Sequence, residues 1–119
     1  MQRRFRLRRR DDFQATLAAG RVYSGPALIA FARRRTEPPT RVGVTASRQL
    51  RGAVLRNRAR RRVREAARLR LGLDDSASGR PGIPFDVILI ARPAAAAADF
   101  AALLRDAEKV AGRLAGADG

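Results

Sequence analysis

Arginine is concentrated between Arg56 and Arg64, where six of nine residues are arginine and one is asparagine. A guanidinium group offers a planar fork of donors to a phosphate, and each neutralised phosphate releases counterions from a nucleic acid. On a helix, at about 100° per residue, the segment divides into two faces. The apolar face consists of Leu55, Ala59, Val63 and Ala66, and the basic face of Arg56, Asn57, Arg60, Arg61, Arg64 and Arg68. Because few acidic residues offset the repulsion between arginines at i,i+4, we predict a docked helix that binds a polyanion.

The whole chain carries the same excess of positive charge. It has 26 basic and 11 acidic residues, a net charge of +15 and an isoelectric point of about 12.0. This balance favours a polyanionic partner, nucleic acid first and an acidic membrane surface second. No apolar run has membrane-spanning length, the Arg-rich start lacks the apolar segment of a signal peptide, and Asp11 and Asp12 are untypical of a transit peptide. We expect one cytoplasmic domain over residues 1–119, with no membrane association and no obligate protein partner.

The usual side chains of protein-based catalysis are missing. The chain has no histidine and no cysteine, which excludes the common acid–base group of metal-free ribonucleases, disulfides and thiolate metal sites. The acidic residues are not clustered at ligand spacing. Asp11 or Asp12 is expected to cap a helix, and Asp106 and Glu108 to lie on a solvated helix face. The Gly-Arg-Pro-Gly segment lacks the lysine of a phosphate-binding loop. The sequence therefore predicts no catalytic residue and no metal ligand, and indicates a binding protein.

Apolar periodicity places these residues on the elements of an α+β fold. Residues 1–9 form a basic arm with two apolar points, Phe5 and Leu7, and residues 73–84 form a flexible loop rich in Asp, Ser, Gly and Pro. Helices are predicted over 11–19, 53–70 and 99–114, and strands within 22–31, 41–46 and 85–91. The last helix is expected to face the core with Phe100, Leu103, Leu104, Ala107, Val110, Ala111 and Leu114. This order indicates a two-layer α/β sandwich in which helices pack on a small sheet.

Ordered motifs along most of the chain carry a family resemblance. They are Arg6-Leu7, Asp12-Phe13 with Gly20, Arg41-Val42-Gly43-Val44, Ser47-Arg48, Ala53-Val54-Leu55-Arg56-Asn57-Arg58 with Arg61 and Arg64-Glu65, and the run from Asp86 to Arg92. In this order and spacing, from about Phe5 to Leu114, the chain resembles the protein subunit of bacterial ribonuclease P. The Ala-Val-x-Arg-Asn-Arg block is the most specific motif. Two positions depart from the family pattern: Gly52 comes one place later than the usual glycine, and Leu17 replaces the aromatic residue of some members.

The resemblance implies a mixed four-stranded sheet with three helices and a left-handed crossover into the basic helix, against the usual handedness. The fourth strand is expected within residues 22–35, as a split or hairpin. In the family the RNA subunit is the catalyst, holds most of the Mg²⁺ and removes the 5′ leader of precursor transfer RNA, so this chain would be an RNA-binding subunit of an endoribonuclease. The residues implied to bind the catalytic RNA are Arg56, Asn57, Arg58, Arg60, Arg61, Arg64 and Arg68. Those implied to bind the leader are Arg6, Phe13, Leu17, Phe31, Ser47 and Arg48.

Other functions and roles stay open at this stage. A small ribosomal or other structural RNA-binding protein would share the charge, the size and a related fold, and only the Ala-Val-x-Arg-Asn-Arg block distinguishes it. A helix-turn-helix DNA-binding protein would need base-reading residues, and only Asn57 qualifies. From the residues alone, Phe13 and Phe31 fit core packing better than a cleft, and Tyr23 fits either edge packing or RNA stacking. The arm arginines fit diffuse phosphate attraction or a disordered tail.

Overall fold

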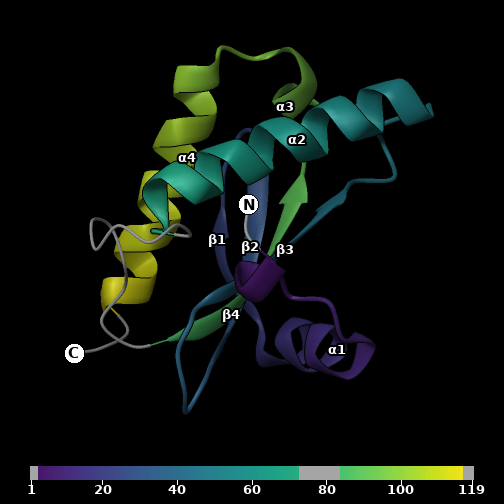
Figure 1. Cartoon of the computed structure of the whole chain (residues 1–119). Coiled ribbons are helices and arrows are strands. Elements are labelled where there is room, and N and C mark those ends of the chain that lie inside the picture. The colour runs from purple at the N-terminus through teal and green to yellow at the C-terminus, as the bar shows by residue number, and fades with distance from the viewer. Residues whose placement is uncertain (1–2, 73–83, 117–119) are drawn as a thin grey trace.

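The computed structural model describes residues 3–72 and 84–116, and their elements form two layers (Figure 1). The strands, in the sheet order β1-β2-β4-β3, are β1 (Arg21–Ser24), β2 (Leu28–Arg34), β4 (Phe85–Ala91) and β3 (Arg41–Ala46). The helices are the 3-10 turn η1 (Arg3–Phe5), α1 (Arg10–Ala19), α2 (Ala53–Arg70), α3 (Ala94–Ala97) and α4 (Phe100–Gly116). The α+β sandwich with a four-stranded sheet is confirmed. The single-turn helix α3 was not predicted, and residues 73–83 of the predicted loop lie outside the described residues.

The strands pair as the predicted hairpin and crossover require. β1 and β2 form an antiparallel hairpin, β2 runs antiparallel to β4, and β3 runs parallel to β4. The parallel pair is joined through α2. In Figure 1, α2 lies between the viewer and the sheet, both strands point upward, and the chain passes from β3 to β4 on its left. The crossover is therefore left-handed, which is the rare hand for a β-α-β unit.

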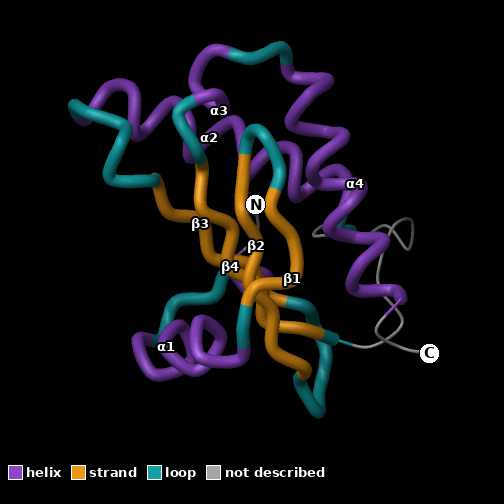
Figure 2. Tube along the Cα trace, turned by 180° about the vertical axis from the view of Figure 1, so that it is seen from behind, coloured by secondary structure: helices purple, strands orange, loops and turns teal. Residues whose placement is uncertain are grey.

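The two faces of the sheet are covered unequally. Successive side chains of a strand point to opposite faces, and the β4 residues in the main core with α2 and α4 are Phe85, Val87, Leu89 and Ala91. The residues between them, which point to the other face, are Asp86, Ile88 and Ile90. On that face α1 covers only one end of the sheet (Figure 2). The remaining surface of the sheet is therefore available for a ligand.

α4 completes the core with the predicted stripe. Its buried apolar residues are Leu103, Ala107, Val110 and Leu114, and its half-buried ones are Phe100, Leu104 and Ala111. Asp106, predicted to be solvated, is only 3% exposed. Its carboxylate accepts hydrogen bonds from the Tyr23 hydroxyl at 2.6 Å and from the Ala27 amide at 2.8 Å. Burial and the hydrogen bond between its hydroxyl group and Asp106 raise the pKa of Tyr23 to about 12. Tyr23 is thus a core residue and does not present its ring for RNA stacking.

α1 begins at Arg10 without the predicted cap. Arg9 occupies the N-cap position and no side chain caps the helix, so the prediction that Asp11 or Asp12 does so is wrong. The other end agrees with the prediction: Gly20 ends α1 at a φ of 114°, which glycine adopts without steric cost. Gly52, the displaced glycine of the family pattern, has a φ of 88° and precedes α2. The turn into the basic helix therefore has a glycine where its backbone needs one.

Candidate nucleic-acid interface

α2 docks through small apolar residues and presents arginine beside them. The fully buried residues of this helix are Ala59, Val63, Ala66 and Ala67. One flank forms a hollow of about 510 Å³, called here the helix hollow, which is lined by Val54, Asn57, Arg60, Arg61 and Arg64. Leu55, predicted on the apolar face, is 47% exposed, because the first turns of α2 project beyond the edge of the sheet (Figure 1).

Guanidinium groups crowd the helix hollow. Arg64 is half-buried, and its pKa is lowered by burial and by the positive charges of Arg6 and Arg60. Arg60 donates a hydrogen bond to Asn57 Oδ1, which orients both side chains. Within residues 3–72 and 84–116, no carboxylate forms an ion pair with Arg60, Arg61 or Arg64. An anion with several oxygens would relieve this repulsion, so the hollow suits phosphate groups.

Arg56 belongs to the predicted basic face but makes contacts within the chain. Its guanidinium donates hydrogen bonds, at 3.3, 3.0 and 3.2 Å, to the backbone carbonyl oxygens of Ala46, Ser47 and Leu50. These bonds hold the connection between β3 and α2 in place. Arg56 therefore orients the helix relative to the sheet.

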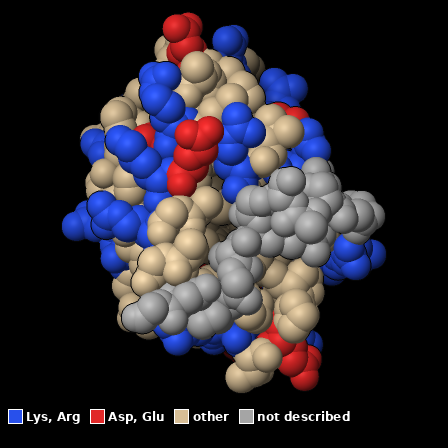
Figure 3. All heavy atoms as spheres, turned by 90° about the vertical axis from the view of Figure 1, so that its left-hand side faces the viewer, with Lys and Arg blue, Asp and Glu red and all other residues tan. Residues whose placement is uncertain are grey.

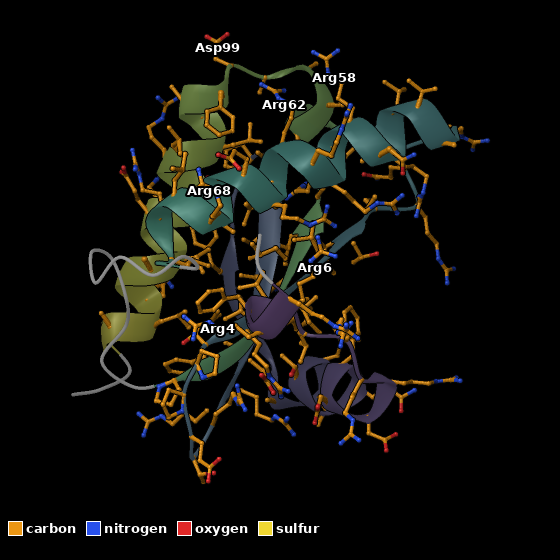
Figure 4. The ribbon with its side chains drawn as sticks, in the orientation of Figure 1. Arg4, Arg6, Arg58, Arg62, Arg68 and Asp99 are labelled. Carbon is orange, nitrogen blue, oxygen red and sulfur yellow. The ribbon has the colours of Figure 1, made fainter. Side chains whose placement is uncertain are left out.

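Two further predicted residues lie away from the helix hollow. Arg68 pairs with Glu65 at 2.6 Å, one turn earlier on α2. Arg58 projects with Arg62 from the edge of α2 nearer to α3 (Figure 4). Arg62, which was not predicted as a site residue, donates hydrogen bonds to two backbone carbonyl oxygens at the end of α3. The seven predicted residues therefore lie in three kinds of place. The helix hollow contains Asn57, Arg60, Arg61 and Arg64, whereas Arg56 bonds to the backbone of this chain, and Arg58 and Arg68 lie on outer edges of the helix.

The opposite face of the sheet begins with a charged row across three strands. Asp86 of β4 lies between Arg33 of β2 and Arg41 of β3. Its carboxylate is 0% exposed and accepts hydrogen bonds from Arg33 Nη2 at 2.7 Å and from Arg41 Nε at 2.8 Å. Burial alone would raise the pKa of Asp86, but the bonds and charges of the arginines outweigh it and lower the pKa.

Asp12 connects α1 to this charged row. It accepts a hydrogen bond from Arg33 and another from Arg41, both at 3.3 Å. Asp12 is the third residue of α1 and not its N-cap, and its carboxylate is directed at the sheet. Asp12 and Asp86 share the same two arginines, so the network fixes how α1 lies on the sheet.

The next row is the apolar row of Phe31, Ile88 and Gly43. Phe13 of α1 lies so close to Gly43 that a β-carbon there would come within 2.9 Å of Phe13 Cε2. Phe13 and Phe31 are both half-buried, and Leu17, one turn after Phe13, is 38% exposed. The aromatic rings therefore combine a packing role with a partly open surface.

The last row consists of Ile29, Ile90 and Thr45 and is called here the open row. All three side chains are half-buried, and the row lies at the end of the sheet that α1 leaves uncovered (Figure 2). Ser47 and Arg48 directly follow β3 at that end. The open row is a candidate binding surface that sequence analysis missed, because its residues alternate in three strands and meet only through the sheet register.

Arg6 is the predicted leader residue that the structure places elsewhere. It pairs with Val42 in an isolated parallel bridge at the edge of β3. Val42 belongs to the core beneath α2, so Arg6 lies on the α2 side of the sheet, below that helix in Figure 4. Its charge accordingly contributes to the lowered pKa of Arg64.

On the α4 side of the molecule, acidic side chains offset part of the positive charge. On the α4 side, acidic groups are interspersed among the basic ones (Figure 3), and Arg70 pairs with Glu108 of α4 at 2.8 Å. Among the described residues no three acidic side chains form a group that could hold a metal ion. None of the helices described is long and apolar enough to cross a membrane.

The fold and the site define a class of protein: a small, basic α/β sandwich with an arginine-lined helix on one face of the sheet and an open apolar surface on the other. The chain belongs to the Ribonuclease P family, whose model matches residues 1–115. A ribonuclease P protein component from Caulobacter vibrioides is 43% identical over 102 residues, which are 85% of this chain and 64% of that relative. The chain thus spans less than two thirds of the Caulobacter relative.

Other relatives match over most of their length. A ribonuclease P protein component from Acidothermus cellulolyticus is 35% identical over 113 residues, which are 93% of this chain and 88% of the relative. The solved RNase P protein of Thermotoga maritima has a TM-score of 0.71 at 24% identity, covering 91% of this chain and 96% of that one. This structural likeness shows that the fold is shared.

Proposed function

We propose that this chain is the RNA-binding protein subunit of ribonuclease P and that it promotes removal of the 5′ leader from precursor transfer RNA. The observation that carries the proposal is the pair of unlike surfaces on opposite faces of one sheet. The helix hollow offers unneutralised guanidinium groups to the phosphate backbone of a structured RNA. The open row, with Phe13 and Phe31 beside it, offers apolar and aromatic surface to the unstacked bases of a single strand.

In this proposal the RNA subunit is the catalyst and the protein supplies binding. The chain has no histidine, and its described residues form no carboxylate cluster for a metal ion, so we assign the Mg²⁺ to the RNA subunit. Arg60, Arg61 and Arg64 bind that RNA and reduce phosphate repulsion where two RNAs meet. The open row binds the leader. Because only precursor transfer RNA carries a leader, this contact raises affinity for the substrate over the product.

The first test is cleavage of a precursor transfer RNA by a bacterial ribonuclease P RNA at low Mg²⁺, with and without this chain. We expect cleavage at the mature 5′ end only when both components are present. Cleavage by the protein alone would reveal a catalytic site in the chain. Absence of stimulation with a cognate RNA would contradict the proposal and favour a structural RNA-binding role.

The second test separates the two surfaces. Arg61→Gln removes one phosphate contact from the helix hollow, so the slope of log affinity for the RNA subunit against log salt should fall by about 0.7 to 0.9. Ile90→Ala removes most of the central apolar side chain of the open row. This change should reduce the preference for precursor over mature transfer RNA and leave that salt slope unchanged. If both variants changed both quantities equally, the two surfaces would not have separate partners.

A further inference from the structure

The N-terminal arm, residues 3–9, is built onto the free edge of β3. Phe5 is 2% exposed and Leu7 is 5% exposed, so both apolar points of the arm are anchored in the protein. The Leu7 amide donates a hydrogen bond to the Val42 carbonyl oxygen at 3.0 Å, and the Arg6 amide donates one to the Arg3 carbonyl oxygen at 3.1 Å. The arginines between these anchors are therefore held at defined positions on the β3 edge.

These arginines line a second hollow of about 250 Å³, called here the arm hollow. Its lining residues are Arg3, Arg4, Arg6, Arg8, Arg9 and Arg41. Arg41 is held by Asp86 and Asp12. By contrast, no carboxylate in the described part of the chain forms an ion pair with Arg3, Arg6 or Arg8. At Arg3, Arg6 and Arg8 the arm hollow therefore carries positive charge that no carboxylate of the described residues neutralises.

The arm hollow adjoins the helix hollow through Arg6. Arg6 belongs to the lining of the arm hollow, and its charge contributes to the lowered pKa of Arg64 in the helix hollow. Figure 4 shows Arg6 between α2 above it and η1 with Arg4 below it. Positive charge thus continues from α2 around the β3 edge toward the start of α1. A chain of phosphodiesters, which carries an anion at every nucleotide, matches an extended series of guanidinium groups better than a single small anion does.

We propose that the arm hollow binds the phosphate backbone of the RNA subunit that α2 binds, so that this interface extends around the edge of β3. The proposal rests on the proposed function and adds a second contact region to it. In this proposal the arm contacts particular phosphate groups of the RNA backbone and does not merely attract RNA diffusely. Because backbone contacts carry no base information, the arm contributes affinity and register without sequence preference.

The test uses the full chain with Arg3→Gln and Arg8→Gln combined, and measures affinity for the RNA subunit over a series of salt concentrations. The control combines Arg105→Gln with Lys109→Gln on the exposed side of α4, which removes the same charge. Loss of two phosphate contacts should lower the salt slope by about 1.4 to 1.8 units. The control should lower the salt slope by less than about 0.5 units, because in this proposal its two side chains do not contact the phosphate backbone of the RNA. Thermal unfolding of both variants should stay close to that of the unaltered chain, because all four side chains are exposed.

The other outcomes overturn the proposal. An unchanged slope in the arm variant, or equal losses in the arm variant and the control, would show that the arm attracts RNA only diffusely. A loss confined to binding of precursor transfer RNA by the assembled complex would assign the arm to the substrate instead. If the unaltered chain bound no RNA subunit at all, the proposed function would fail together with this extension. If the unaltered chain bound the RNA subunit and the arm variant bound it with the same affinity and the same salt slope, the extension alone would fail.

Discussion

The buried carboxylate of Asp86 is the feature whose removal should cost the most stability. Asp86→Asn keeps the size of a side chain that is 0% exposed but removes the negative charge between Arg33 and Arg41. Removing one partner of a buried ion pair costs about 3–5 kcal/mol. Because the two arginines retain 34% and 21% exposure, water screens part of their repulsion, and we expect the lower limit, about 3 kcal/mol. With an unfolding entropy of roughly 2.1 cal/mol/K per residue, this loss lowers the Tm of the 119-residue chain by about 12 °C.

Urea unfolding at several pH values measures this loss and tests its electrostatic origin. The pKa of Asp86 is lowered in the folded state, so its contribution is complete above the unfolded-state pKa of about 3.9 and is lost as the pH falls through the folded-state pKa. The difference between the unaltered chain and Asp86→Asn should thus be constant from about pH 7 to about pH 5 and shrink below about pH 4. Asp11→Asn, which removes the same charge from an exposed site, should cost less than about 0.5 kcal/mol. A loss under about 1 kcal/mol at pH 7, or one that stays constant in acid, would refute this reasoning.

Three further changes test other contacts. Tyr23→Phe deprives the buried Asp106 carboxylate of a hydrogen bond and should cost about 1–3 kcal/mol of unfolding free energy. Because Tyr23 is the only tyrosine, its absorbance titration in the folded protein should centre at about pH 12; stability should fall as the pH rises above about 10, and a folded-state midpoint near 10 would contradict the assignment. Gly43→Ala forces Phe13 away from the sheet and should cost about 1–3 kcal/mol in urea unfolding while reducing the preference for precursor transfer RNA. Arg62→Ala, which removes two hydrogen bonds to α3, should cost about 1–3 kcal/mol without changing the salt slope of RNA binding, whereas a changed slope would place Arg62 in the RNA interface.

Periodicity predicted the elements well where one face of an element is apolar. The stripe of α4 arises from burial of a single face, and the apolar run of β4 from its central place in the sheet, where nearly every side chain is buried on both faces. The same reasoning predicted the docked residues Ala59 and Val63 of α2. It failed for Leu55, because a helical wheel gives the direction of a side chain and not whether a partner reaches that turn of the helix.

Contacts between distant segments could not be predicted from local patterns. Asp106 bonds to Tyr23, which is 83 positions away in the sequence, and Asp12 is directed at two arginines of the sheet instead of its own helix end. The position of Arg6 beside β3 likewise depends on the bridge to Val42, which no local pattern indicates. In each case the partner is determined by strand register and helix docking, which the sequence specifies only through the complete fold.

The central place of β4 in the sheet has a consequence for how the chain folds during synthesis. β4 separates β2 from β3, and each of these strands pairs with it. When residues up to the end of α2 have left the ribosome, the β1–β2 hairpin and β3 have no strand to join them, and the row that links Arg33 to Arg41 lacks its carboxylate. Sheet formation must therefore await Phe85–Ala91, and pairing over such sequence distances is slow. A nascent chain stalled before β4 should remain sensitive to protease throughout the strands that precede it.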